Sequence, residues 1–233
     1  MQLVLLCGGL GSRIKKIDDI NPKGMIKINN RPFIDYVIKS IENYNFSSIH
    51  FCLGFKSQKY LHHLEKNYSH LNYTYSIEKE EYLLGTGGAI KNCLDFLEDN
   101  FIIQYGDTIV KLNYSEFYKL HLKEKKPITM SILNSYKSEE APNLFCKKSS
   151  FGKFECIYNK KNPPLNANYI DYGSLACKKE IFNKKAEKIF DLSDMQEEFS
   201  KRNLIYFHEV YEKYIEIGTP FSYEKAKLKL NDI

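Results

Sequence analysis

The sequence predicts an α/β fold, formed by a single Rossmann-like domain with a mostly parallel, mixed sheet and helices on both of its faces. Two observations lead to this prediction. Short apolar runs of strand length alternate with segments of helical periodicity through the first half of the chain, which is typical of parallel strands joined by crossover helices. The chain has 233 residues, enough to bury one full core, so we expect one domain over residues 1–233.

The first half contains four expected strands, and a helix follows each of the first three. The strands are expected over residues 2–7, 49–55, 73–77 and 101–105. Pro32 suits a first helical turn, and apolar residues at helical spacing predict a helix over residues 32–44. Ser57 and Thr86 carry hydroxyls that can cap the next two helices. Because ligands of such folds bind beyond the carboxyl ends of the strands, we expect the site at that edge of the sheet.

The second half of the chain is less regular. Strands are expected over residues 128–133, 154–158, 174–177, 204–210 and 214–217. Ser193 with Gln196 resembles a capping box that opens a helix. Thr219 with Pro220 is expected to open the last helix. Residues 159–168 contain two adjacent prolines and are expected to form a loop.

The composition, with 43% hydrophobic and 27% charged residues, is that of a globular protein. The net charge of +5 is dispersed, so we expect a small anionic ligand and no nucleic acid. No apolar run is long enough to span a membrane and no leader pattern is present, so we expect no membrane partner and a cytoplasmic location. The six cysteines form no CxxC pair, which predicts reduced thiols and neither a zinc site nor a disulfide framework.

The turn after the first expected strand combines glycines with two cations. Glycines let the backbone approach an anion closely and leave N–H groups free to bind it, and Arg13 and Lys23 add positive charge. Ile14 stands where a dinucleotide fingerprint has its third glycine, and no Walker A motif occurs. We therefore expect a nucleotide-phosphate site, the alternative being a tight strand–helix connection. The residues expected to bind the nucleotide here are Leu6, Gly8, Gly9, Gly11, Ser12, Arg13 and Lys23.

A second glycine-rich segment and two carboxylates complete the nucleotide end of the predicted site. Gly85 and Thr86 open an expected helix, where small residues would let a flat base lie against the backbone; the alternative is a glycine-softened helix start. Asp107 follows Gly106 at the end of a buried strand, and Glu216 lies between apolar residues. Carboxylates beside a phosphate site are natural Mg²⁺ ligands. The alternatives are an aspartate that forms a turn and a glutamate that faces solvent from an alternating strand.

The acceptor end of the site is expected in the second half of the chain. Lys160 or its neighbour Lys161 would hold a phosphate on the acceptor. Asp171, with Gly173 two residues later, would accept hydrogen bonds from sugar hydroxyls. The alternative is a solvated basic loop followed by a turn aspartate.

With these motifs, the chain resembles the sugar-1-phosphate nucleotidylyltransferases over nearly its whole length. The matching segments, in order, are residues 7–13, 22–23, 84–86, 106–107 and 216–220. Ser12 replaces the family's usual threonine, Gly24 replaces a proline, and Glu216 replaces an aspartate. Because of Gly24, we expect a looser loop around Lys23. Within the family, the short length and the element over residues 169–173 look most like the D-glycero-D-manno-heptose 1-phosphate guanylyltransferases.

The resemblance implies a fold of the nucleotide-diphospho-sugar transferase type and a Mg²⁺-dependent reaction. A nucleoside triphosphate, with GTP favoured, and a sugar 1-phosphate, with heptose 1-phosphate favoured, would give an NDP-sugar and pyrophosphate. Arg13, Lys23 and Asp107 would be the catalytic residues, and Asp107 and Glu216 would be the metal ligands.

The resemblance also divides the chain, with residues 1–110 expected to bind the nucleotide and residues 111–233 the sugar phosphate. We expect a monomer or a homodimer. Three alternatives stay open: a cytidylyl- or uridylyltransferase acting on another sugar phosphate or a phosphocholine-like acceptor, a non-catalytic nucleotide-binding protein, and an NAD-dependent oxidoreductase. The missing third glycine counts against the last of these.

Overall fold

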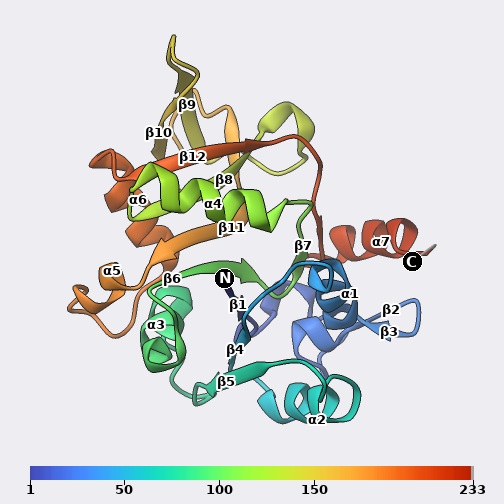
Figure 1. Cartoon of the computed structure of the whole chain (residues 1–233). Helices are drawn as coiled ribbons and strands as arrows, with labels where there is room; N and C mark the ends of the chain where they lie inside the picture. Colours follow the sequence, from blue (N-terminus) through green and yellow to red (C-terminus); the bar gives the residue numbers. More distant parts are fainter. Residues whose placement is uncertain (232–233) are drawn as a thin grey trace.

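The computed structural model describes residues 1–231, whose centre is a nine-stranded mixed sheet (Figure 1). The strand order is β10-β9-β11-β6-β1-β4-β5, and β8 pairs with both β11 and β12. The nine strands are β1 (Gln2–Leu6), β4 (Ile49–Leu53), β5 (Tyr73–Ile77), β6 (Asn100–Tyr105), β8 (Ile128–Asn134), β9 (Leu144–Lys148), β10 (Phe154–Tyr158), β11 (Tyr169–Lys178) and β12 (Ile205–Val210). The predicted single-domain α/β fold is confirmed.

The sheet is parallel in its first half and mixed in its second half. β1 pairs in parallel with β4 and β6, and β4 pairs in parallel with β5. β11 runs antiparallel to both β6 and β8. The carboxyl ends of β1, β4, β5 and β6 therefore lie along one edge of the sheet. Figure 1 shows the β9–β10 hairpin at the opposite end of the molecule from β5.

Helices cover both faces of the sheet. They are α1 (Phe33–Ile41), α2 (Ser57–Asn67), α3 (Gly85–Asn92), α4 (Tyr114–Glu124), α5 (Glu180–Asn183), α6 (Leu192–Lys201) and α7 (Pro220–Lys229). Leu3 and Leu5 of β1 point into a core shared with α1, α2, α4 and α7, whereas Val4 points into a core shared with α3, α5 and α6. Among residues 1–231, no helix has both the length and the apolar character that crossing a bilayer requires.

Two short strand pairs and several 3₁₀ turns lie outside the main sheet. They are β2 (Lys27–Ile28) with β3 (Arg31–Pro32), β7 (Thr108–Ile109) with β13 (Ile215–Glu216), and the turns η1 (Ser12–Ile14), η2 (Lys23–Met25), η3 (Leu94–Phe96) and η4 (Ser135–Lys137). The antiparallel β7–β13 pair joins the middle of the chain to a segment near its end, and it places two carboxylates of the predicted site side by side.

Three predicted helix caps are wrong and one is confirmed. Ser57 is the first residue of α2 and no side chain caps that helix. Thr86 lies inside the first turn of α3, and Ser193 inside the first turn of α6. Thr219 does cap α7: its hydroxyl accepts the Ser222 N–H at 3.1 Å, and the Ser222 hydroxyl accepts the Thr219 N–H at 2.9 Å.

The expected boundaries hold best for short strands. The strands over residues 73–77 and 154–158 match β5 and β10 to the residue, whereas the helix expected over residues 32–44 ends at Ile41. The sequence patterns predict neither β9 nor α4. α4 begins after Asn113, whose side chain accepts an N–H of the first turn.

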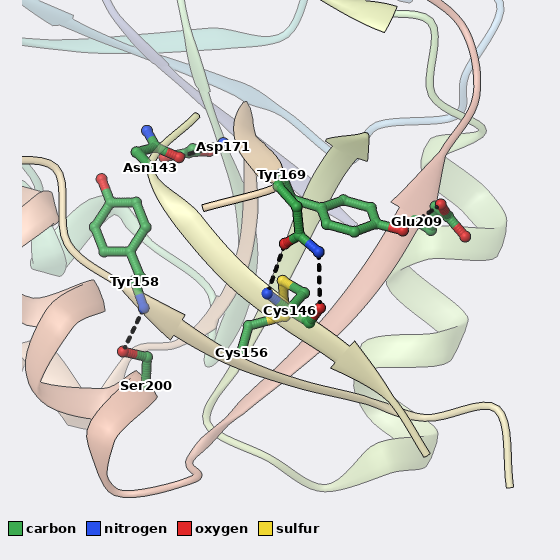
Figure 2. Close-up of a disulfide and its surroundings, with 9 residues drawn as sticks. Asn143, Cys146, Cys156, Tyr158, Tyr169, Asp171, Ser200 and Glu209 are labelled. Carbon is green, nitrogen blue, oxygen red and sulfur yellow. Dashed lines mark hydrogen bonds between the residues drawn. A yellow bond between two sulfur atoms is a disulfide. The ribbon is translucent and has the colours of Figure 1, made fainter. Parts of the chain in front are cut away.

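The β9–β10 hairpin carries a disulfide between Cys146 and Cys156, so the prediction of reduced thiols is wrong for this pair (Figure 2). The two residues face each other in antiparallel register. The backbone N–H and C=O of Cys146 bond to the Asn168 side chain instead of to β10. The pair is therefore of the non-hydrogen-bonded kind, in which side chains approach most closely. Cys7, Cys52, Cys93 and Cys177 are buried free thiols.

Candidate active site

A cavity of about 450 Å³ lies at the edge of the sheet where β1, β5 and β6 end. Most of the predicted site residues border it. They are Leu6, Gly8, Gly9, Arg13, Lys23, Gly85, Thr86, Gly106, Asp107, Lys160, Asp171, Gly173 and Glu216. Gly11 and Ser12 are not among the residues that border the cavity. Segments that are far apart in the sequence thus meet around one cavity.

The turn after β1 presents backbone and one cation to the cavity. No atom lies within 4 Å of a Cβ built on Gly9, so this residue faces open space. Gly11 has a φ of +61°, in the left-handed region that favours glycine. It precedes η1, which begins at Ser12 and carries Arg13 to the cavity. Gly11 and Ser12 therefore shape the turn that positions Arg13.

Lys23 and Asp107 form an ion pair at the cavity. Lys23 Nζ lies 2.6 Å from Asp107 Oδ2, and Thr108 Oγ1 donates a hydrogen bond to Asp107 Oδ1 at 3.0 Å. The two side chains are 18% and 25% exposed, so water screens this pair less than it screens a surface pair. Any cation that binds Asp107 has to compete with Lys23.

The turn that carries Lys23 is held in place by a contact between Gly24 and Tyr60. A Cβ on this residue would lie 2.4 Å from the Tyr60 hydroxyl oxygen, so a larger residue would displace that side chain. The Gly24 N–H donates to the same hydroxyl at 3.0 Å, and the contact is buried. The turn is thereby tied to α2, contrary to the expectation of a loose loop around Lys23.

The second carboxylate, Glu216, lies beside Asp107 because of the β7–β13 pair. Glu216 is opposite Thr108 in that pair, and the Ile217 N–H donates to the Asp107 carbonyl at 3.2 Å. The Glu216 carboxylate accepts the N–H of Gly218. Burial raises the pKa of Glu216, and the nearby negative charge of Asp107 raises it further.

These residues fit a divalent cation that prefers oxygen ligands. The two carboxylates border one cavity and interact unfavourably with each other, and an ion between them would relieve that repulsion. Mg²⁺ is commonly held by one or two carboxylates together with substrate phosphates and water. Arg13 lies close by, since a Cβ built on Gly218 would be 3.6 Å from Arg13 Nη2. The donor set is therefore suited to a Mg²⁺-bound polyphosphate.

The first turn of α3 is already hydrogen-bonded to the segment that precedes α6. The N–H groups of Gly87 and Gly88 donate to the Phe190 carbonyl at 2.9 and 3.1 Å, and the Thr86 N–H donates to Asp191 Oδ1 at 3.2 Å. The N–H groups of these three residues therefore already have protein acceptors and are not free to bind a base. Their glycines serve close packing, although Thr86 still borders the cavity.

Glu78 borders the cavity and is a residue that the sequence patterns do not reveal. It follows β5 directly and is only 8% exposed. Its Oε2 accepts the Leu84 N–H at 2.8 Å, and burial raises the pKa of Glu78. In the sequence it opens the run Glu-Lys-Glu-Glu, which is typical of a solvated loop. Its place directly after a strand of the parallel set is the signal that points to it.

The structure distinguishes the two candidate lysines at the acceptor end. Lys160 borders the cavity. Lys161 instead has its Nζ 2.6 Å from Asp194 Oδ1 on α6, with 65% of its side chain exposed. Lys160 is therefore the lysine that a phosphate in the cavity would meet.

Asp171 is held in a fixed orientation at the same end. Its Oδ1 accepts the Gly173 N–H at 2.9 Å, and its Oδ2 accepts Gln196 Nε2 at 3.1 Å. Its own N–H donates to Asn143 Oδ1 at 3.0 Å, and Figure 2 shows Asn143 and Asp171 side by side next to the disulfide hairpin. Burial raises the pKa of Asp171, and the positive charge of Lys160 partly offsets this. The remaining lone pairs can accept hydrogen bonds from hydroxyls.

Together, the fold and the cavity define an α/β protein whose site, at the carboxyl edge of the sheet, is compatible with a polyphosphate. The chain belongs to the nucleotidyl transferase family, whose model matches residues 2–231. The family that the motifs indicate is thus confirmed.

Two curated relatives are similar to this chain over nearly its whole length. They are D-glycero-alpha-D-manno-heptose 1-phosphate guanylyltransferases of Campylobacter jejuni, 28% identical, and of Aneurinibacillus thermoaerophilus, 27% identical. These alignments cover 96% and 99% of this chain and 97% and 98% of the relatives. Among solved structures, HddC of Yersinia pseudotuberculosis complexed with GMP-PN has a TM-score of 0.74 at 24% identity, covering 98% of this chain and 99% of that one. That likeness supports the fold.

Proposed function

We propose that this chain transfers a guanylyl group from GTP to a sugar 1-phosphate, with heptose 1-phosphate as the favoured acceptor, and releases pyrophosphate. The observation that carries the proposal is the shared cavity, which Lys23, Asp107 and Glu216 border together with Lys160 and Asp171. Two heptose 1-phosphate guanylyltransferases that align over almost the whole chain support the choice of substrates.

The chain's own residues would act by positioning and by neutralising charge. A phosphate oxygen of the sugar attacks the α-phosphorus of the triphosphate, and the bond to the β-phosphate breaks. The nucleophile is already an anion, so no protein nucleophile is needed. Lys160 would hold the acceptor phosphate, and Asp171 would orient the sugar through its hydroxyls. Arg13 and Lys23 would stabilise the negative charge that develops on the departing pyrophosphate.

Asp107 and Glu216 would hold Mg²⁺, which when bound supplies the positive charge that offsets repulsion between the donor and acceptor phosphates. Asp107 pairs with Lys23, so an ion held by Asp107 would compete with the Lys23 ammonium. Lys23 would then be available to the β- and γ-phosphates of the donor.

Glu78 supports guanine as the base. One of its carboxylate oxygens accepts the Leu84 N–H, which leaves the other oxygen to accept from a ligand. Guanine offers a ring N–H and an amino group side by side, and the remaining oxygen has two lone pairs with which it can accept from them. Uracil has no amino donor at that edge. A buried carboxylate left without its partner is costly, so this contact would discriminate among bases.

We also propose that residues 1–110 bind the nucleotide and residues 111–233 bind the sugar phosphate. Glu216 is shared between these two roles, since it borders the cavity next to Asp107. A monomer or homodimer stays a prediction. A cytoplasmic location also stays a prediction, and the hairpin disulfide does not favour it, because disulfides persist mainly in oxidising compartments.

A pyrophosphate-release screen tests the proposed function. Four nucleoside triphosphates are combined with a panel of sugar 1-phosphates that includes heptose 1-phosphate, in the presence of Mg²⁺. We expect the highest kcat/KM for GTP with heptose 1-phosphate. Higher activity with CTP or UTP would show that the donor carries a pyrimidine base and not guanine. Tight nucleotide binding without pyrophosphate release for any pair would instead support a non-catalytic nucleotide-binding protein.

A further inference from the structure

Three side chains of types that commonly ligate metals meet in the core, outside the lining of the cavity. His50 and Cys52 lie two residues apart on β4, so both point to the same face of the sheet. Cys93 directly follows α3, which packs on that face. The three residues are 0%, 1% and 0% exposed, and none of them borders the cavity. Their ligand atoms lie within 4.8 Å of one another.

The spacing of these atoms is close to that of a metal centre. Tetrahedral zinc with its usual bond lengths places two thiolate sulfurs about 3.8 Å apart and a sulfur and a nitrogen about 3.6 Å apart. The Cys52 and Cys93 sulfurs are 3.7 Å apart. The His50 ring has to approach the sulfurs by at most about 1.2 Å to complete the set. That movement is within the range of a small side-chain rotation.

The surroundings of His50 also suit a ligating histidine. Its Nδ1 lies 2.8 Å from Thr74 Oγ1 and its Nε2 lies 3.1 Å from Ser76 Oγ. A histidine that binds a metal through one nitrogen usually donates its other N–H to such a partner. Thr74 and Ser76 are only half-buried, and their strand, β5, forms one end of the sheet. Ser76 or a water molecule can fill a fourth position.

We propose that His50, Cys52 and Cys93 form a binding site for a thiophilic d¹⁰ ion, Zn²⁺ or Cu⁺, distinct from the Mg²⁺ site of the proposed reaction. Soft thiolate ligands together with an imidazole select such ions over Mg²⁺. On binding, the two thiols lose their protons to solvent while the imidazole stays neutral. The ion would fasten the end of α3 to β4. Because the first turn of α3 borders the cavity at Thr86, the site would stabilise one wall of it.

Cobalt titration tests the proposal, with Co²⁺ as the spectroscopic probe for the zinc form. The full chain carries Cys146→Ser and Cys156→Ser, so that the hairpin thiols do not contribute under reducing conditions. After treatment with a chelator, we expect about one equivalent of Co²⁺ to give a thiolate-to-cobalt charge-transfer band, which one equivalent of Zn²⁺ removes. A parallel anaerobic titration with Cu⁺, read by native mass spectrometry, decides which of the two ions is preferred.

Matched variants locate the ion. Cys52→Ala and Cys93→Ala should each abolish the band, whereas Cys177→Ala, at another fully buried free cysteine, should keep it. Thermal unfolding without metal confirms that the variants fold, and Zn²⁺ should raise Tm in the parent protein but not in Cys93→Ala. If an alanine variant does not fold, the serine variant at the same position replaces it, because serine also removes the thiolate that gives the band.

Absence of the band in the parent at saturating Co²⁺, together with no binding of Cu⁺, would overturn the proposal. A band that survives in Cys52→Ala or Cys93→Ala would overturn it as well, because the thiolate ligands would then lie elsewhere. Nucleotidyl transfer with Mg²⁺ is measured separately. The metal site and the proposed function can therefore fail independently of each other.

Discussion

The ammonium of Lys23 lies 2.6 Å from the carboxylate of Asp107, although 84 residues separate the two in the sequence. One residue of this pair is expected to bind a cation and the other an anion. Each side chain therefore has a charged partner with which its expected ligand would compete. The proposed reaction would use both groups, Asp107 to hold Mg²⁺ and Lys23 to neutralise phosphate charge.

Replacing Lys23 should separate metal binding from turnover. In Lys23→Met, the Asp107 carboxylate loses its competing cation, so the nucleotide-free protein should bind Mn²⁺ several-fold more tightly than the wild type. The rate of pyrophosphate release should fall by about a hundredfold or more, because a preorganised positive charge is lost. Electron paramagnetic resonance of free Mn²⁺ measures the first effect. Unchanged Mn²⁺ affinity would show that Lys23 does not compete with the metal ion for the Asp107 carboxylate.

Glu216 should link stability to pH in a defined direction. Its pKa in the folded protein is above the ordinary value of 4.5, mainly because of burial. The folded chain therefore binds a proton at Glu216 more readily than the unfolded chain, and the contribution of this group to stability falls as the pH rises past 4.5.

Glu216→Gln should accordingly be more stable than the wild type at neutral pH but less active. The difference in unfolding free energy between this variant and the wild type should shrink as the pH is lowered through the acid range, where the wild-type carboxyl becomes neutral. Urea unfolding at a series of pH values measures this difference. A Gln variant that is less stable than the wild type at neutral pH would mean that hydrogen bonds to the charged carboxylate stabilise the fold by more than its burial costs.

The two neighbouring lysines provide a matched pair of variants for the acceptor end. Lys160→Ala should raise KM for the sugar 1-phosphate by about tenfold or more, with little change in KM for the nucleotide, because it removes a charge-assisted contact to one substrate only. Lys161→Ala removes the same charge next door but breaks only the exposed pair with Asp194, so its kinetics should stay near those of the wild type. Equal effects of the two changes would indicate general loss of positive charge.

Glu78 should set the choice of base. Glu78→Gln preserves size and can still accept the Leu84 N–H, but it loses the charged acceptor facing the cavity. We expect kcat/KM for GTP to fall by about tenfold, while the values for pyrimidine nucleotides change little. Steady-state kinetics with all four nucleoside triphosphates measure the ratio. A uniform fall across the four bases would assign Glu78 a structural role.

The grouping of the residues at the proposed nucleotide end could be predicted because local sequence determines it. Gly8, Gly9 and Asp107 follow strands of a parallel set, and such strand ends always meet at one edge. Glu216 was predicted from the family motif and its apolar neighbours, and the β7–β13 pair explains its position beside Asp107.

Features that depend on contacts between distant segments could not be predicted from the sequence. The Cys146–Cys156 pair requires β9 to lie opposite β10, and the residues of β9 show no clear alternation. Lys160 and Lys161 are neighbours in one loop, so only the position of Asp194 on α6 separates their roles. Glu78 resembles the solvated charges around it, and only the end of β5 places it in the cavity. In each case the missing information is a tertiary contact.

The most direct test of the account is the turnover of Asp107→Asn over a range of Mg²⁺ concentrations. The substitution keeps the size of the side chain and its hydrogen bond from Thr108, so the fold should be retained, as circular dichroism can verify. The account predicts that pyrophosphate release falls by about a hundredfold or more and that the Mg²⁺ concentration needed for half-maximal rate rises. Near-normal turnover at ordinary Mg²⁺ would contradict the central claim that this carboxylate holds the catalytic ion.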